Sequence, residues 1–414
     1  MMTNSTVANV HVENLAHRYD RKGLAIFIIA ALIGVALRFA LAAYGHNFDI
    51  ASYRIVADLV ANGKSVYAET ERYNYGPIWF HVLHFLDLLP SPSPDPLWAL
   101  RWKVVAFLTG VDIIIAALLF RRYGVLVAIL FLLNPISIIV TGYHSQFDNL
   151  AVLVAILAAR LIGDRETSSD FKKISGFVLI GVSLIIKHIT FMFPIWLFFG
   201  FQSRRLKILA VLIPYGLFLL SFVPYFRSVS GIVHHVFLYH SIPNGPFWKE
   251  IAPDFVANKV ALPLFFLAAM FLVGLYWRKR SAPESLWLYL TSLVVFSSSI
   301  ANQYLAIPVS AISVSWNPFY GIYTLFATFY LAGSHDGLAL PWLASVYPDG
   351  GINSIGYGVN KFLGYREVIV ALFLGLVYQE MTKDQRASVF HKLRNYALWV
   401  RAQLVQQWKE IWTR

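Results

Sequence analysis

Long apolar runs separated by short polar segments dominate the chain, and they predict membrane-spanning helices. A spanning helix needs roughly 20 mostly apolar residues, and about twelve stretches are candidates for such a helix. Several are short, and 174–187 and 188–200 fit either two spans or one long broken helix. The predicted fold class is an all-α polytopic membrane protein with about 11–13 transmembrane helices. The candidate stretches are roughly 23–44, 98–120, 123–142, 147–163, 174–187, 188–200, 205–225, 258–277, 285–301, 303–317, 318–333 and 364–380.

Composition agrees with this pattern. Of the 414 residues, 58% are hydrophobic and only 14% are charged, against roughly 25% charged residues in soluble domains. These values exclude a soluble globular protein and a disordered one. The chain has no cysteine, which excludes disulfides, thiolate metal sites and a cysteine nucleophile.

The distribution of positive charge predicts the orientation of the chain. With a cytoplasmic N-terminus and alternating spans, 22 of the 34 Lys and Arg residues fall on the cytoplasmic side. The net charge of +12 is therefore mostly an orientation signal and a contact with anionic membrane lipids. A nucleic-acid partner is not expected, because no soluble domain carries a basic face. The first twenty residues are polar, so no cleavable signal peptide is predicted.

We expect one integral-membrane domain over 1–380 and a basic amphipathic cytoplasmic helix over 381–414. This topology leaves three long external loops, at about 45–97, 226–257 and 334–363. In the first loop, the apolar positions of 51–62 follow helical spacing, and 76–89 shows a similar pattern. Both segments are predicted to be short helices that lie in the membrane interface.

Polar residues in apolar surroundings are the candidates for chemistry, and two of them lie in the first external loop. Asp49, just beyond the first helix, fits a general base at a partly desolvated surface. It fits equally well an N-cap for the helix that begins near Ile50. Tyr73-Asn74-Tyr75-Gly76-Pro77 fits a sugar platform, but an interfacial aromatic belt followed by a turn explains it at least as well.

The segment 142–149 places several polar side chains between two apolar helices. Polar groups at membrane depth are costly and are candidates for function. A capping box formed by Ser145 and Asp148 is the structural alternative. It leaves His144 and Gln146 without a role, so a functional site is the favoured interpretation.

Three further groups lie at predicted external positions or in external loops. Lys187-His188 fits either a snorkelling lysine at a helix end or a pair of phosphate donors. Asn302-Gln303-Tyr304 fits helix capping or a cavity wall. His234, His235 and His240 are possible metal ligands, but they lack a nearby Asp or Glu at ligand spacing, so metal is not favoured.

The order of these motifs resembles the GT-C superfamily of polytopic glycosyltransferases, which use polyprenyl-phosphate sugars. The N-terminal half resembles the dolichyl-phosphate-glucose glucosyltransferases in its Asp49, its turn Tyr75-Gly76-Pro77, its segment 144–148 and its pair Lys187-His188. The segment 302–304 is more similar to bacterial mannosyl- and hexosyltransferases of the superfamily. The chain departs from the family pattern at Gly76, which replaces a proline, and at Asp148, where a Tyr-Asn pair is usual.

The resemblance implies a GT-C fold and an inverting hexosyltransferase. It implies that Asp49 is the catalytic base, that the donor is a polyprenyl-phosphate sugar and that the acceptor is a lipid-linked or other glycan hydroxyl. No cofactor is implied, because the lipid-phosphate sugar is a substrate. The predicted external loops contain no Asn-x-Ser/Thr sequon, which is compatible with a bacterial inner membrane and an active site that faces the periplasm. The implied phosphate-binding residues are Lys187, His188, Arg54, Arg72 and Arg101, and the implied sugar- or acceptor-binding residues are Tyr75, His144, Gln146, Asp148, Asn302, Gln303 and Tyr304.

The alternative is a polytopic transporter or lipid flippase, which also has many helices and polar residues at membrane depth. It predicts internal inverted symmetry and a midplane site. The sequence shows no repeat, and its polar groups gather towards one face. A non-catalytic membrane scaffold is a third interpretation, and it leaves Asp49 and His144 unexplained.

Overall fold

The structure is a computed structural model that describes residues 21–91, 93–165, 167–239, 245–251, 261–334, 337–340, 364–382, 384–386 and 388. Within these ranges every regular element is a helix, as the sequence predicts. The first half contains α1 (Arg21–Tyr44), α2 (Asp49–Ala61), α3 (Val66–Glu69), α4 (Pro77–Leu88), α5 (Pro96–Tyr123), α6 (Val125–Leu132), α7 (Pro135–Gly142), α8 (Asp148–Ile162), α9 (Asp170–Ile186), η1 (His188–Thr190) and α10 (Phe193–Gly200). The second half contains α11 (Arg204–Leu220), η2 (Val223–Ser228), α12 (Val229–Ile232), η3 (Val233–Phe237), α13 (Pro246–Ile251), α15 (Ala261–Tyr276), α16 (Ala282–Val295), η4 (Asn302–Ala306), α17 (Val309–Val314), α18 (Pro318–Gly333) and α21 (Tyr365–Glu380).

Two described helices, α1 and α5, are each long and apolar enough to cross a membrane. Two bent pairs, α6 with α7 and α11 with the segment 223–237, would raise the number to four. The other apolar helices are shorter, such as α8 with 15 residues and α9 with 17. The membrane character is therefore supported, while a total of about 11–13 spans stays a prediction.

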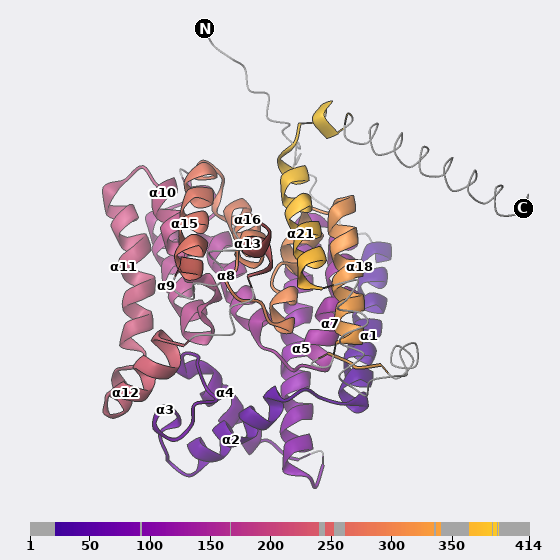
Figure 1. Cartoon of the computed structure of the whole chain (residues 1–414), viewed down its shortest axis with the longest axis vertical. Coiled ribbons are helices and arrows are strands. Elements are labelled where there is room, and N and C mark those ends of the chain that lie inside the picture. Colours follow the sequence, from indigo (N-terminus) through magenta and orange to yellow (C-terminus); the bar gives the residue numbers. More distant parts are fainter. Residues whose placement is uncertain are drawn as a thin grey trace, which may run out of the picture.

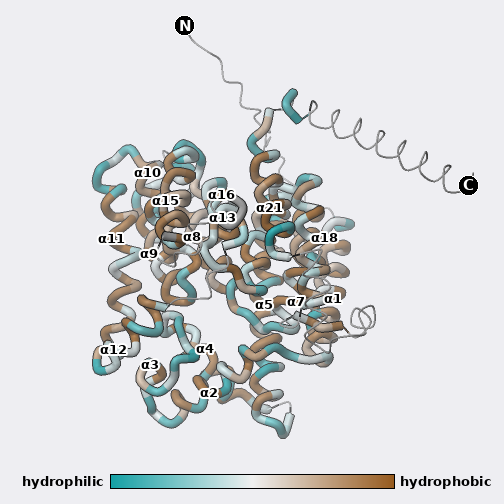
Figure 2. Tube along the Cα trace, viewed as in Figure 1, coloured by the Kyte–Doolittle hydropathy of each residue, from teal (hydrophilic) through white to brown (hydrophobic). Residues whose placement is uncertain are grey.

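Hydrophobic residues cover the outside of the upright helices, and α1 exposes Leu32 at 65% and Ile29 at 57%. Figure 2 shows hydrophobic residues along the upright helices and more hydrophilic segments at their two ends. An apolar face of this kind is stable against lipid rather than water.

The helices expected in the first external loop are both present, as α2 and α4, and a third short helix, α3, lies between them. Figure 1 places α2, α3, α4 and α12 together at one end of the bundle, opposite the end at which α1 begins and α21 finishes. Pro77 begins α4, where its missing N–H costs nothing. Asp95 caps α5 by accepting hydrogen bonds from the backbone N–H groups of Leu97 and Trp98.

Much of the remaining external and C-terminal sequence lies outside the described residues. Of the loop expected at 334–363, the structure describes residue 334 and residues 337–340, and it describes only part of 226–257. Most of the amphipathic helix expected over 381–414 also lies outside the described ranges.

A buried ion pair connects the helices behind the α2–α4 end. Arg38 in α1 donates from Nε to Asp112 Oδ2 in α5 at 2.9 Å, and both side chains are 1% exposed. The remaining nitrogens of Arg38 donate to Gly34 O, Leu132 O and Ser137 Oγ. Asp112 accepts from Thr141 Oγ1 at 2.8 Å and from Asn149 Nδ2 at 2.7 Å. The pair therefore fixes α1, α5, α7 and the first turn of α8 against one another.

Removing one partner of this pair should destabilise the protein strongly. Arg38→Ala or Asp112→Ala would leave an uncompensated buried charge, and the expected loss is about 3–5 kcal/mol. Arg54→Ala, which removes the partly exposed pairs with Asp58 and Asp87, is the control and should cost about 1 kcal/mol. Thermal unfolding of the purified variants in detergent measures this difference. Equal midpoints for Asp112→Ala and Arg54→Ala would contradict it.

Candidate functional site

Three chain segments bring the predicted polar residues together at the α2–α4 end of the bundle. Asp49 is the first residue of α2 and Asp148 is the first residue of α8. Gln146 lies two residues before α8, and Lys187 follows the last residue of α9. These four residues are called the polar cluster below. They are continuous in space because Gln146 bonds to Asp49 on one side and to Lys187 on the other.

Asp49 does not cap its helix. The N-cap of α2 is Phe48, and no side chain caps this end. Instead, Asp49 Oδ2 accepts hydrogen bonds from Gln146 Nε2 at 2.6 Å and from Asn47 Nδ2 at 2.8 Å. Both donors meet the same oxygen, and no described residue donates a hydrogen bond to Oδ1 of this half-buried carboxylate.

Asn47 also positions His144. Its Nδ2 lies 2.9 Å from His144 Nδ1, and since an amide nitrogen only donates, the imidazole nitrogen accepts. Asn47 Oδ1 in turn accepts from the backbone N–H of Asp49. One amide therefore holds both Asp49 and His144 in fixed orientations.

Lys187 and Asp148 form the second half of the polar cluster. Lys187 Nζ lies 2.8 Å from Asp148 Oδ2, with side-chain exposures of 3% and 1%, and 3.4 Å from Gln146 Oε1. Asp148 therefore pairs with Lys187 rather than forming the capping box that was the structural alternative. Its second oxygen, Oδ1, is buried and has no hydrogen-bond partner among the described residues.

Aromatic rings surround the lysine. The Lys187 ammonium lies 4.7 Å from the ring centroid of Phe147 and 5.0 Å from that of Tyr75, within the range of cation–π attraction. Phe147 stacks on Trp79 with ring centroids 4.2 Å apart. Tyr75 also lies beside His188, at 6.3 Å between ring centroids. The Tyr75 turn thus contacts both halves of the Lys-His pair.

Tyr304 in η4 approaches the cluster from the second half of the chain. Burial raises the pKa of the Tyr304 phenol, and the nearby Asp148 and Asp49 raise it further. Burial also raises the pKa of the Tyr75 phenol, with smaller contributions from Tyr304 and the same two carboxylates. Tyr304 is therefore the member of segment 302–304 that lies near enough to the two carboxylates for them to affect its pKa.

Other predicted residues have different partners. Asn302 donates to Ser334 Oγ and accepts from Tyr365 Oη, which ties it to α18 and α21. Gln303 is half-buried, and among the described residues no hydrogen bond connects it to the cluster.

The three candidate arginines each have a defined environment. Arg54 pairs with Asp58 and Asp87, and its guanidinium holds the pKa of the Asp87 carboxyl below its usual value through a hydrogen bond. Arg72 lies over the ring of Phe48, 3.7 Å from its centroid, next to Asp49. Arg101 is fully buried and donates to the backbone carbonyls of Ala42, Gly45 and Gly142. Arg101 therefore fixes the backbone at the end of α1 and at Gly142, whereas Arg72 contacts Phe48, the residue that precedes Asp49.

The backbone around the cluster is tightly constrained. Ser145 adopts a φ of +56°, a left-handed conformation that is uncommon outside glycine and costs of the order of 1–3 kcal/mol. Gly76 allows a close approach, since a Cβ at this position would lie 2.0 Å from the carbonyl oxygen of Ile185 near the end of α9. Gly76 therefore brings the aromatic turn into contact with the segment that carries Lys187.

Sequence reasoning missed Asn47 and Tyr53. Tyr53 in α2 is buried, and its hydroxyl has no hydrogen-bond partner among the described residues. Burial raises the pKa of this phenol, and the nearby Asp49 raises it further. Asn47 had a local signal, because it lies two residues before Asp49. Tyr53 had a weaker one, four residues after Asp49 on the same predicted helix.

The histidines of the 226–257 loop do not form a metal centre in the described part of the chain. No group of three or more metal-ligating side chains occurs there, and His240 lies outside it. His234 and His235 line a separate cavity instead.

Comparison of the chain with protein-family models, with curated proteins and with solved structures returned no match.

The close approach at Gly76 gives a direct test of the site architecture. Gly76→Ala should cost about 1–3 kcal/mol, because the new methyl group meets a backbone carbonyl. Gly110→Ala in α5 is the matched control, since nothing lies within 4 Å of the added Cβ. We expect Gly110→Ala to unfold at or slightly above the wild-type temperature in detergent. The assignment fails if Gly76→Ala unfolds at the same temperature as Gly110→Ala.

Proposed function

We propose that this chain is an inverting glycosyltransferase that moves a hexose from a polyprenyl-phosphate donor to an acceptor hydroxyl. The observation that carries the proposal is the hydrogen-bonded chain from Asp49 through Gln146 to Lys187 and Asp148. It holds a candidate base and a candidate phosphate-binding cation in one fixed arrangement at one end of a helical, apolar bundle. The motif order that resembles the GT-C superfamily supports the same function.

In this proposal Asp49 is the general base. Its Oδ1 accepts the proton of the acceptor hydroxyl while the acceptor oxygen attacks C1 of the sugar. The bond between C1 and the phosphate oxygen breaks, and polyprenyl phosphate leaves with the electron pair. Gln146 and Asn47 hold the carboxylate through Oδ2, so the reactive oxygen needs no reorganisation.

Lys187 would stabilise the charge that develops on the leaving phosphate. Its ammonium carries three N–H donors, and the described residues supply two acceptors, Asp148 and Gln146. The third N–H is available for a phosphate oxygen. His188 and Arg72 are the next donors in reach of the same region, and the rings of Tyr75 and Tyr304 would line the sugar.

A lipid-linked donor accounts for the apolar exterior. The polyprenyl tail would reach the site within the bilayer, and the cluster would lie at the external end of the spans. Under the positive-inside orientation this end faces the periplasm of a bacterial inner membrane. No metal or cofactor takes part in the proposed step.

Asp49→Asn should remove the base while keeping the shape of the side chain. General-base assistance is worth roughly 10²–10⁴-fold, so we expect a loss of turnover of at least about 10²-fold with an unchanged unfolding temperature. Asp58→Asn is the matched control, because Asp58 lies on the same helix with its side chain 56% exposed.

The measurement is release of polyprenyl phosphate when the purified full chain is incubated with polyprenyl-phosphate hexoses. Near-normal turnover by Asp49→Asn would remove Asp49 from the mechanism. If wild-type protein only moved intact donor between leaflets of a vesicle, the enzyme proposal would be wrong and the transporter alternative correct.

A further inference from the structure

Residues 223–237 follow α11 after a bend of 56°, and one side of this segment packs against the protein. Ser228 is buried on that side, and its Oγ lies 2.6 Å from Oγ of Ser65, the N-cap of α3. Gly231 allows a close approach to the same helix, since an added Cβ would lie 1.8 Å from the carbonyl oxygen of Tyr67. The segment is therefore held against α3, at the end of the bundle that carries α2 and α4 (Figure 1).

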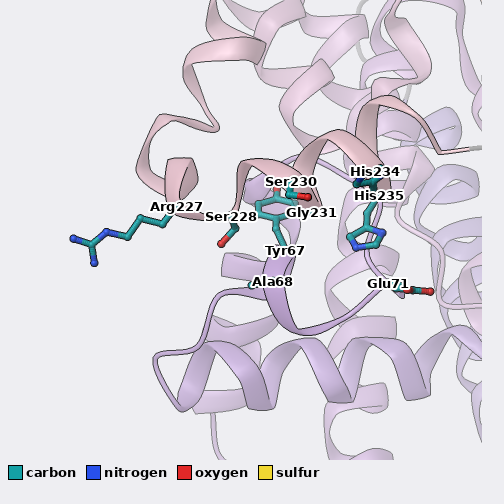
Figure 3. Close-up of a pocket in the computed structure, with 9 residues that line it drawn as sticks. All are labelled: Tyr67, Ala68, Glu71, Arg227, Ser228, Ser230, Gly231, His234 and His235. Atoms are coloured by element: carbon teal, nitrogen blue, oxygen red, sulfur yellow. The ribbon is translucent and has the colours of Figure 1, made fainter.

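The exposed part of this segment has an apolar face and a polar face side by side. The apolar face consists of residues that recur at helical spacing and are 38–73% exposed, namely Val223, Phe226, Val229, Val233 and Phe237. The polar face consists of three exposed residues at similar spacing, Arg227, Ser230 and His234. Figure 3 shows the guanidinium of Arg227 directed away from Tyr67 of α3. A segment that packs on protein and exposes both kinds of face fits the boundary between hydrocarbon and water.

The apolar face continues the lipid-facing surface of α11. Leu212, Leu219 and Leu220 of α11 are 57–64% exposed. Val223, the first residue of the apolar face, follows them around the bend and is 62% exposed. Because apolar side chains exposed on α11 are stable against lipid rather than water, the same lipid accounts for the exposed apolar face beyond the bend.

The bend leaves α11 short for a typical bilayer. Its exposed apolar residues lie within 208–220, a length of about 18 Å, and the exposed Arg204 and Arg205 precede them. On the other side of the bundle, α1 exposes apolar residues from 24 to 44, about 30 Å, which matches the hydrocarbon core. Tilting α11 would reduce its height further. A span that is too short is accommodated by thinning of the surrounding bilayer.

We propose that residues 223–237 lie in the membrane interface at the α2–α4 end of the bundle, and that the bilayer is thinner along α11 than along α1. The partner of the apolar face is the acyl-chain region of the leaflet at that end. The polar face is directed towards headgroups and water, where Arg227 reaches the lipid phosphates. This surface does not depend on the glycosyltransferase proposal.

The short side of the protein also carries Lys187. The helices α9 and α11 have 17 residues each, and both end at the α2–α4 end of the bundle. They pack closely, since a Cβ added to Gly181 would lie 2.9 Å from Cδ1 of Leu217. Lys187, which follows α9, therefore lies near the depth of the proposed interface. In a consequence that rests on the proposed function, a thin leaflet would present the phosphate of a lipid-linked donor at the depth of Lys187.

Spin labelling tests the interface, and the chain suits it because it has no cysteine of its own. Nitroxides are attached to single cysteines in the full chain in nanodiscs of phosphatidylcholine and phosphatidylglycerol. Their collision rates with lipid-soluble oxygen and with a water-soluble nickel chelate are then compared. The matched neighbours are Val229→Cys with Ser230→Cys, and Val233→Cys with His234→Cys. We expect the ratio of oxygen to nickel collisions to be several times higher at each valine position, and highest at Leu212→Cys in α11.

Two other outcomes would overturn the interface. Nickel-dominated collisions at both members of each pair would place the segment in water, with its apolar face available to a soluble partner. Oxygen-dominated collisions at both members would show that the segment continues the span through the hydrocarbon. Two independent pairs are used, and unfolding temperatures identify any labelled variant that has failed to fold.

The thickness is tested by thermal unfolding of the full chain in nanodiscs of phosphatidylcholines that differ only in acyl-chain length. We expect the highest midpoint in bilayers thinner than the usual hydrocarbon core of roughly 30 Å. A midpoint that keeps rising up to that thickness would overturn the thinning.

A variant of α11 connects the thickness to this helix. Arg205→Leu lengthens the exposed apolar side of α11 by about one turn and should shift the highest midpoint to longer acyl chains. Arg122→Leu, at the end of the longer helix α5, is the matched control and should leave it unchanged. An unchanged optimum in Arg205→Leu would contradict the assignment of the short span to α11. None of these measurements involves turnover, so failure of the interface and failure of the enzyme proposal are distinguishable.

Discussion

The buried pair between Arg38 and Asp112 constrains the arrangement on which the candidate site depends. A guanidinium in an apolar helix is tolerated only when its charge and its N–H groups are satisfied, and the acceptors here come from α1, α5 and the α6–α7 chain. The partner carboxylate is shared with Thr141 and Asn149, at the two ends of the link that carries His144 and Gln146. Because the alternative is an unpaired buried charge, these helices have one favourable arrangement. The position of Asp148, next to Asn149, follows from it.

The site is held by groups that do not belong to it. Arg101 binds the carbonyls at the end of α1 and at Gly142, and Gly142 itself packs so closely that an added Cβ would lie 2.6 Å from Arg38 O. Between these fixed points the chain accepts a left-handed serine at 145. Such pre-organisation is what a reaction that stabilises charge requires, because the donors do not move when the charge develops. The contacts that make the segment between α7 and α8 rigid therefore also position the groups that the proposed chemistry uses.

The sequence predicted the helical class, the helices α2 and α4, and the proximity of Asp49, segment 144–148 and Lys187, because hydrophobic periodicity and span order place all three at one end of the bundle. It did not predict which atoms pair. Phosphate binding by Arg101 and Arg54 stays a prediction, but their partners within the protein were not predicted. Arg101 donates to backbone carbonyls and Arg54 pairs with Asp58 and Asp87, since a long cation takes the nearest acceptor that the tertiary fold supplies. The break at Asn134 within an apolar run was also missed, because capping by Asn134 and the following proline overrides hydrophobic length.

Gly76 has a consequence for how this chain can vary during evolution. A proline at this position, as in the glycosyltransferases that the motif order resembles, would bring a Cβ into the space occupied by the Ile185 carbonyl. The φ of −70° at Gly76 itself suits proline. The proline ring is excluded instead by the carbonyl of Ile185 in α9. The close packing of the end of α9 against this turn therefore requires glycine at position 76. Among descendants of this chain, substitutions at 76 and around 185–187 should be acquired together, so that two short motifs far apart in sequence are inherited as one unit.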